Sequence, residues 1–278
     1  MDFFKKIIFA HQKLGMNYQI SGQGKALVLL HGFLEDSRIW DPFLAQLEKK
    51  HQVVLIDLFG HGKSEKRGHE HTMEAQAKAI QKILIEENIG EASFIGHSLG
   101  GYVSLAFTEI FPEKTKSLIL LNSTSEADSE ERKNNRDRAI SFLDSNKEVY
   151  VNMAIKNLFA PQTLERCKTD ISVLVKRAQK LSAEAIIATV KGMKNRKDRT
   201  EVLRDFSGEK VIIAGKNDPI IPFEDIQKVS KETHSILKTL PNGHMGYLEN
   251  EVEVKQIFEG LFLWFGKKIV VQGHFERR

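Results

Sequence analysis

Short apolar runs recur along the first part of the chain, each interrupted by glycine or by polar residues. Lys25–Leu30 stops abruptly at His31-Gly32, and Val53–Asp57 is a run of the same kind. A continuous apolar run without polar alternation is typical of a strand covered on both faces, as in parallel sheets. We therefore predict buried strands at these two positions. The other strands predicted in this part are Ile7–Gln12, Met16–Ser21, Ala92–Gly96 and Ser117–Leu121.

Segments with apolar residues at helical spacing alternate with these strands. The clearest is Met73–Glu87, whose preceding Thr72 can cap its start. Asn88 and Gly90 can close its end. Strand–helix–strand repetition implies right-handed crossovers, so we predict an α/β fold with a mostly parallel central sheet and helices on both faces. The other predicted helices here are Arg38–Lys49 and Leu99–Phe111.

The pattern changes near residue 124. Up to Thr200 the chain has no convincing strand, and it has helical patterns near Ser129–Asp144, Lys147–Phe159, Leu164–Lys180 and Ala183–Lys194. Strands resume at Lys210–Ala214 and Ser235–Leu240, and an apolar helix follows at Val254–Phe265. We therefore predict a helical cap, residues 124–200, inserted between two parts of an α/β core, residues 1–123 and 201–278.

Composition and charge narrow the function classes. The chain has 278 residues, 41% of them hydrophobic, which is enough for one large α/β domain with an insertion. The net charge of +4 is too small to indicate nucleic-acid binding. The predicted cap carries 16 Lys and Arg against 11 Asp and Glu, and the rest of the chain carries 25 against 26. All the net positive charge therefore lies in the cap.

The N-terminus and the single cysteine bear on location. Lys5 and Lys6 interrupt the first apolar run, which a signal peptide would keep continuous, and no segment has the roughly 18 apolar residues of a membrane span. Cys167 alone excludes an internal disulfide framework or a cysteine-built zinc site, and it is compatible with a reducing compartment. We expect a cytoplasmic protein that binds neither membrane nor nucleic acid.

The strongest chemical signal is Gly96-His97-Ser98-Leu99-Gly100, directly between a predicted strand and a predicted helix. A serine there sits on a very tight turn that the small glycines permit. The turn lifts the hydroxyl above the carboxyl edge of the sheet, at a helix N-terminus whose N–H groups favour negative charge. We predict that Ser98 is a nucleophile; the alternative is a structural turn that needs small residues.

A nucleophilic serine needs a base and a group that orients the base. His244 lies in a glycine-flanked loop after the last predicted strand, where it can reach the sheet edge. Asp218 follows the strand Lys210–Ala214, at the end where α/β proteins place functional groups. We predict His244 as the base and Asp218 as the orienting acid; the alternative for each is an ordinary loop residue. Other acids considered are Glu126 and Asp128 and, less well placed, Asp205 and Asp225.

An oxyanion also needs hydrogen-bond donors. The segment that follows Lys25–Leu30 ends at the same sheet edge as Ser98. We predict that the backbone N–H groups of Phe33 and Leu99 form the oxyanion hole. For His31 we expect a bracing role in this loop.

Five segments give the chain a resemblance to a known family: HGFLEDSRIW, DLFGHGKS, GHSLGG, GKNDPIIP and NGHMGYLE. Together they resemble the α/β-hydrolase superfamily, in its group of capped esterases, C–C hydrolases and haloperoxidase-like proteins, over nearly the whole chain. The resemblance implies an α/β-hydrolase fold, whose triad follows the chain order of Ser98, Asp218 and His244. It also implies that three residues of DLFGHGKS brace a loop beside the site: Asp57, His61 and Ser64.

Residue 98 separates mechanisms within this superfamily. Haloalkane dehalogenases and epoxide hydrolases carry aspartate there, so serine argues against both. The resemblance implies that Ser98 attacks a carbonyl, that His244 takes its proton and that Asp218 holds the imidazolium. We expect a hydrolase of small to medium carboxylic esters with an acyl-serine intermediate, without metal or organic cofactor. The alternatives are C–C bond hydrolysis and an elimination like that of the menaquinone-pathway enzyme that makes 2-succinyl-6-hydroxy-2,4-cyclohexadiene-1-carboxylate (SHCHC). A remote alternative is a ligand-sensing module.

The cap is expected to choose the small-molecule substrate. Its cations are a candidate site for a carboxylate-bearing substrate: Arg132, Lys133, Arg136, Arg138, Lys194, Arg196, Lys197 and Arg199. The preferred interpretation is a solvated helix face of mixed charge, because acids are interleaved with the first group. These acids are Asp128, Glu130, Glu131 and Asp137. Met153, Leu158 and Phe159 are candidates for an acyl pocket, although core packing is the commoner use of such residues. The oligomeric state is left open.

Overall fold

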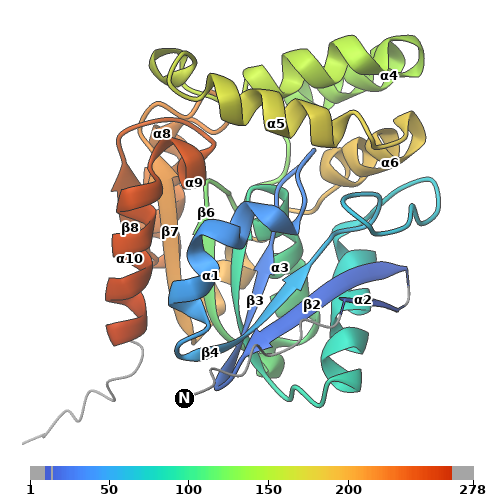
Figure 1. Cartoon of the computed structure of the whole chain (residues 1–278). Coiled ribbons are helices and arrows are strands. Elements are labelled where there is room, and N and C mark those ends of the chain that lie inside the picture. Colours follow the sequence, from blue (N-terminus) through green and yellow to red (C-terminus); the bar gives the residue numbers. More distant parts are fainter. Residues whose placement is uncertain (1–9, 14, 265–278) are drawn as a thin grey trace, which may run out of the picture.

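The computed structural model describes residues 10–13 and 15–264. Its centre is an eight-stranded sheet with the order β1-β2-β4-β3-β5-β6-β7-β8 (Figure 1). From β4 to β8 in this order neighbouring strands pair in parallel, whereas β1 with β2 and β2 with β4 pair antiparallel. The mostly parallel sheet predicted from the apolar runs is therefore confirmed. The strands are β1 (Ala10–Lys13), β2 (Met16–Gly22), β3 (Lys25–Leu30), β4 (His51–Ile56), β5 (Ala92–His97), β6 (Thr115–Leu121), β7 (Glu209–Gly215) and β8 (Ile236–Leu240).

Helices cover both faces of the sheet, as predicted (Figure 1). On one face lie α1 (Asp41–Leu47) and α10 (Glu251–Trp264), joined by an edge-to-face contact of Phe43 and Phe258 with ring centroids 5.5 Å apart. The other face carries α2 (Met73–Glu86), α3 (Leu99–Ile110), α7 (Thr200–Asp205) and α8 (Phe223–Thr233). Apolar runs such as Leu27–Leu30 are fully buried between these layers. This burial explains why β3 has no polar alternation.

Local signals place the ends of these elements. The Thr72 hydroxyl accepts a hydrogen bond from the Ala75 N–H and so caps α2, as predicted. Asn88 follows α2 with φ of 56°, a left-handed conformation that asparagine tolerates. Parts of two predicted elements lie outside the described residues: residues 7–9 of the first strand and Phe265 of the last helix. In the described part of the chain, no helix combines the length and the apolarity that spanning a membrane requires.

The segment between β6 and β7 holds α4 (Glu130–Lys156), α5 (Lys168–Ala178) and α6 (Ala183–Lys194), which lie above the carboxyl ends of the strands (Figure 1). α4 contains the two helices predicted near Ser129–Asp144 and Lys147–Phe159, and they meet at a kink. The kink lies at Asn146, whose φ of −135° and ψ of 36° are not helical. The Asn146 side chain donates to the Phe142 carbonyl at 3.4 Å.

Candidate active site

Ser98 lies between the end of β5 and the first residue of α3. Its φ of 47° and ψ of −111° are strained for a residue with a side chain. A Cβ atom at Gly96 would lie 2.4 Å from the backbone of Gly100, and one at Gly100 would lie 2.4 Å from the carbonyl oxygen of Leu30. The two glycines thus let α3 start against the end of β3, and this close packing forms the tight turn that holds the serine.

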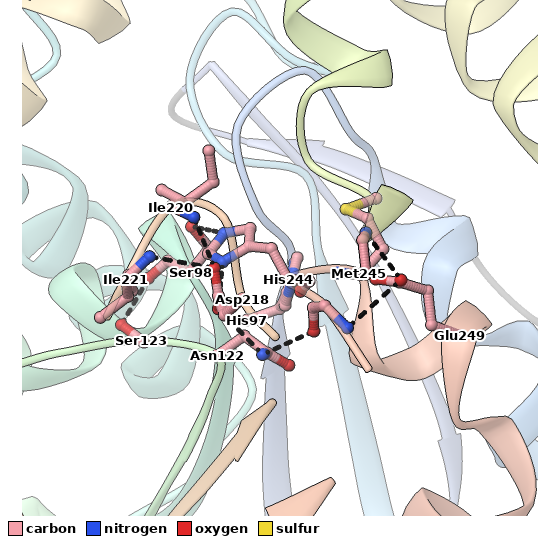
Figure 2. A network of polar contacts seen from close by, with 12 residues as sticks. His97, Ser98, Asn122, Ser123, Asp218, Ile220, Ile221, His244, Met245 and Glu249 are labelled. Atoms are coloured by element: carbon pink, nitrogen blue, oxygen red, sulfur yellow. Dashed lines mark hydrogen bonds and ion pairs between the residues drawn. The ribbon is translucent and has the colours of Figure 1, made fainter. Parts of the chain in front are cut away.

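The side chains of Ser98, His244 and Asp218 lie in a row at the carboxyl edge of the sheet (Figure 2). Ser98 Oγ is 2.9 Å from His244 Nε2, and His244 Nδ1 is 2.8 Å from Asp218 Oδ2. A carboxylate only accepts, so Nδ1 carries the hydrogen and Nε2 is left to accept from the serine hydroxyl. His244 is 1% exposed and Ser98 is 8% exposed. The structure therefore brings together the three residues that the sequence analysis selected.

Asp218 is surrounded by donors that favour its charged form. Its Oδ1 accepts from the N–H groups of Ile220 at 2.8 Å and Ile221 at 3.0 Å. Its Oδ2 accepts from Asn122 Nδ2 at 3.1 Å. Burial raises the pKa of the carboxyl, but His244 and the backbone donors outweigh burial and lower it. The sequence analysis missed Asn122, which carries no motif and is only one of several polar residues after β6.

The other acids considered lie elsewhere. Asp128 accepts from Arg136 Nε at 2.5 Å and from Arg196 Nη1 at 2.6 Å. Glu126 accepts from the Thr124 hydroxyl at 3.4 Å. Of the acids considered, Asp218 is therefore the one that contacts His244. Two remaining acids pair with cations near the surface: Asp205 with Arg204, and Asp225 with Lys228.

Glu249 fastens the loop that carries His244. This residue ends α9 (Gly246–Glu249), and its carboxylate accepts from the amides of Gly243 at 3.2 Å and Met245 at 3.0 Å, on either side of His244. It also accepts from the amide of Ala160, in the predicted cap, at 3.0 Å. Sequence reasoning missed Glu249 as well, although it belongs to the quoted segment NGHMGYLE.

The amides predicted to form an oxyanion hole lie on two adjoining elements. Leu99 is the first residue of α3, where an N–H group has no acceptor within the helix. The amides on both sides of Phe33 are engaged, that of Gly32 with a carboxylate at 2.5 Å and that of Leu34 with an imidazole at 3.2 Å. The Phe33 amide has no acceptor among the described residues. Two N–H groups are thus left for a ligand.

Buried side chains brace the loops below the site. His31 Nε2 accepts from the Leu58 amide at 2.9 Å. His61 Nε2 accepts from the Leu34 amide, and burial lowers the pKa of His61 to about 3, so the ring stays neutral and able to accept. Asp57 accepts from the backbone of the segment after β3 and of its own loop, at Ser37 and Lys63, both within 2.9 Å. The Ser64 hydroxyl donates to the Asp57 carbonyl at 2.5 Å.

Two further buried residues beside the triad were not selected from the sequence, Glu35 and His97. Their side chains are 2.9 Å apart, and His97 also contacts the His244 backbone. Glu35 stands as an ordinary polar residue in HGFLED, and His97 occupies the variable position before the serine.

Most of the cap cations are paired with acids. Arg136 and Arg196 share Asp128, and Arg196 also stacks on the Tyr102 ring at 4.2 Å. Further pairs are Lys133 with Glu130, Lys194 with Asp137, Lys197 with Glu74, and Arg199 with Glu74 and Glu109. Arg132 donates to the Ile220 carbonyl, and Arg138 donates to Asn135. Among the candidate apolar residues, Phe159 is buried, Leu158 is half-buried and Met153 is 50% exposed. No three His, Cys, Asp or Glu side chains gather as metal ligands in residues 10–13 and 15–264.

Comparison with known proteins identifies the family. Residues 25–251 match the family described as alpha/beta hydrolase fold, and the chain belongs to it. A thermophilic esterase from Thermogutta terrifontis superposes with a TM-score of 0.85 and 25% identity, over 94% of this chain and 98% of the esterase. The chain thus has the alpha/beta hydrolase fold, and a solved esterase and a putative carbamate hydrolase are similar to it.

Relatives in sequence carry several different names. A putative carbamate hydrolase RutD from Azorhizobium caulinodans is 25% identical over 74% of this chain and 78% of its own length. A putative 2-succinyl-6-hydroxy-2,4-cyclohexadiene-1-carboxylate (SHCHC) synthase from Bacillus subtilis is 27% identical over 40% of this chain and 42% of its own length. An uncharacterized protein from Mycobacterium tuberculosis is 34% identical over 38% of this chain, a match that spans 31% of that protein.

Proposed function

We propose that the protein cleaves small to medium carboxylic esters as a serine hydrolase with an acyl-serine intermediate. The observation that carries the proposal is the unbroken hydrogen-bonded row of Ser98, His244 and Asp218, with separations of 2.9 and 2.8 Å. Similarity to an esterase over 94% of the chain supports an ester as the substrate class.

In this mechanism Ser98 Oγ attacks the ester carbonyl carbon and its proton moves to His244 Nε2. The carbonyl oxygen becomes an oxyanion that accepts from the amides of Phe33 and Leu99. His244 then protonates the leaving alkoxide as the ester C–O bond breaks. Water, deprotonated by His244, attacks the acyl-serine, and the acid leaves with Ser98 restored. Asp218 stays anionic and stabilises the imidazolium in both steps.

In this proposal the predicted cap covers the active site. Residues 124–200 would roof the triad, exclude bulk water and select a small-molecule substrate. Six of the eight candidate cations form ion pairs with acids, which favours an uncharged acyl group over a carboxylate-bearing one. We place the protein in the cytoplasm, because Cys167 is its single cysteine and is unpaired.

A substitution of the nucleophile tests the proposal. Ser98→Ala should lower kcat on p-nitrophenyl esters of graded acyl length by about 10⁴- to 10⁶-fold, because the bond-forming atom is removed. Wild-type protein should be labelled at Ser98 by a fluorophosphonate. Ser172→Ala, at an exposed serine of α5, is the matched control and should keep full activity. Unlabelled Ser98 together with unchanged turnover in Ser98→Ala would refute the assignment.

The RutD-named and SHCHC synthase-named relatives define the second candidates. The same triad can attack a carbamate carbonyl, or it can act as a base in an elimination or in C–C cleavage of an acidic diketone. Strong turnover of a carbamate or an acidic diketone, with only trace ester turnover, would favour these. Ligand binding that survives Ser98→Ala, without product from any substrate, would point to a sensing module.

A further inference from the structure

A second carboxylate–imidazole pair lies directly beside the triad. Glu35 Oε2 is 2.9 Å from His97 Nδ1, and the two side chains are 2% and 1% exposed. His97 immediately precedes Ser98, and Glu35 lies two residues after Phe33. The proposed mechanism assigns no proton transfer to either residue, so the burial of two ionisable groups here needs a physical reason.

The hydrogen-bond pattern fixes the charge of His97. Its Nδ1 faces the Glu35 carboxylate, and its Nε2 is 3.0 Å from the carbonyl oxygen of His244. Both partners accept, so both ring nitrogens must donate and the ring is an imidazolium. Glu35 is occupied by two more donors, the Gly32 amide at 2.5 Å and the Tyr247 hydroxyl at 3.1 Å. Each polar atom of the pair thus has a matching partner.

The surroundings support the same protonation state. Burial lowers the pKa of His97, but the charge and hydrogen bond of Glu35 outweigh burial and raise it. Burial raises the pKa of Glu35, but the charge and hydrogen bond of His97 outweigh burial and lower it. Burial and Glu35 raise the pKa of Tyr247 well above its usual range, so its hydroxyl keeps donating.

Other titratable groups face the pair from the neighbouring elements. The His97 ring centroid lies 5.4 Å from that of His244 and 5.2 Å from that of Tyr247. The Asp218 charge contributes to raising the pKa of His97. His31 contributes to lowering the pKa of Glu35. Glu35 is the only acid within hydrogen-bonding distance of the His97 ring among the described residues.

The pair joins three loops that the reaction needs in a fixed arrangement. Glu35 holds the Gly32 amide, one residue before the proposed oxyanion donor Phe33. His97 holds the backbone carbonyl of His244, whose ring accepts from Ser98. A Cβ at Gly32 would lie 2.6 Å from His97 Nδ1, so the packing leaves no room for a water that could replace the contact.

We propose that Glu35 and His97 are positioning residues whose charged pair fixes the His244 loop relative to the oxyanion loop. This rests on the proposed function, because positioning matters only where Ser98 is the nucleophile. The charge of the Glu35–His97 pair matters for this positioning, because hydrogen bonds that involve charged partners are roughly twice as strong as neutral ones. A glutamine at position 35 could still accept from Gly32 and His97 with Oε1 and donate from Nε2 to the Tyr247 hydroxyl, so Glu35→Gln chiefly removes the charge.

Glu35→Gln tests the proposal by kinetics. We expect kcat and the rate of Ser98 labelling by a fluorophosphonate to fall about 10- to 100-fold, as an ångström-scale misplacement does, with KM changed by less than about threefold. Glu113→Gln, at an exposed position after α3, is the matched control and should match wild type. His97→Gln keeps a donor toward the His244 carbonyl but lacks the charge, and should show the same loss. It carries the kinetic test if Glu35→Gln does not fold.

Nitrogen-15 NMR of histidine-labelled protein tests the charge without any substrate. We expect a ring with both nitrogens protonated to persist at about pH 7.5, above the ordinary histidine pKa of about 6.5. This signal should be absent in His97→Gln, and it should titrate at lower pH in Glu35→Gln. A neutral His97 at that pH, or Glu35→Gln and His97→Gln both within twofold of wild type, would overturn the proposal. Wild-type protein in which Ser98 is not labelled would instead refute the proposed function, and the NMR result would still report the charge.

Discussion

The loops at the sheet edge and the helices above them are held by different kinds of contact. In the loops, carboxylates such as Asp218 and Glu249 are bound to backbone amides and lie buried. In α4, which has 27 residues, only Leu143, Val151 and Ile155 are buried, and its ion pairs join long side chains, although Arg132 and Lys147 also donate to backbone carbonyls. Backbone contacts fix atoms closely, whereas long side chains on exposed helices can rearrange. Under the proposed function, catalytic geometry would depend on the backbone-anchored loops and substrate choice on the more exposed helices.

The largest effect should follow from a change within the loops. Asp218→Asn keeps the shape of the side chain but favours the wrong tautomer of His244, so we expect kcat to fall about 10⁴-fold. The measurement is steady-state turnover of the preferred ester. Asp144→Asn, at an exposed position in α4, is the control and should leave kcat unchanged. A loss of less than tenfold in Asp218→Asn would show that another group orients the histidine.

A matching change in the cap should affect stability rather than catalysis. Asp128→Asn leaves Arg136 and Arg196 without their shared anion, so the free energy of unfolding should fall by about 3–5 kcal/mol. Turnover of the folded variant should stay within about threefold of wild type. Urea unfolding and kinetics on the same preparation measure both. A large loss of kcat at unchanged stability would show that this ion-pair cluster of the predicted cap affects catalysis in the same way as the loops at the sheet edge.

The pH dependence of the same variant sharpens this prediction. Burial raises the pKa of Asp128, but Arg136 and Arg196 outweigh burial and lower it below the unfolded value of about 3.9. Its stabilisation is therefore present above about pH 4 and is lost as the pH falls through the folded pKa. Urea unfolding between pH 7 and pH 3 should show a smaller acid loss of stability in Asp128→Asn than in wild type. Equal acid losses would contradict the assignment.

A smaller effect is expected at Asn122. Its Nδ2 donates to Asp218 and to the Gly243 carbonyl, both at 3.1 Å. Removing a hydrogen bond to a charged group costs about 1.5–3 kcal/mol, so Asn122→Ala should lower kcat about 10- to 100-fold. Asn152→Ala, on the exposed side of α4, is the control. A kcat within twofold of wild type would mean that the backbone amides alone hold Asp218.

The smallest effect is expected at the exposed apolar positions of the cap. Met153 is 50% exposed, so Met153→Ser should change the free energy of unfolding by less than about 0.5 kcal/mol. Phe159→Ser, at a buried position near the end of the same segment, is the contrasting variant and should destabilise strongly. Thermal unfolding of both variants measures the difference. Strong destabilisation by Met153→Ser would mean that this face of α4 is covered.

Sequence periodicity located most elements but not their exact relation. The helices predicted on either side of residue 146 are both present and meet at a kink at Asn146. The spacing of apolar residues shows that the helical phase changes near residue 146. It does not show the angle at which the two helices meet. Glu35, Asn122 and Glu249 were missed for a related reason. Each has a hydrogen-bond partner far along the chain. In the sequence, a polar residue near a strand end looks the same with or without such a partner.

The sequence by itself indicated the turn at Ser98, because the steric need for Gly96 against the backbone of Gly100 is local. It also determined the parallel sheet, because strands buried on both faces must be apolar throughout. Only the tertiary structure decided which polar groups meet. Ser98 and His244 are 146 residues apart, and strand order together with the loop contacts of Glu249 brings them to the same sheet edge. Steric and hydrophobic patterns involve near neighbours in the chain, whereas these hydrogen bonds join residues that only the assembled sheet brings together.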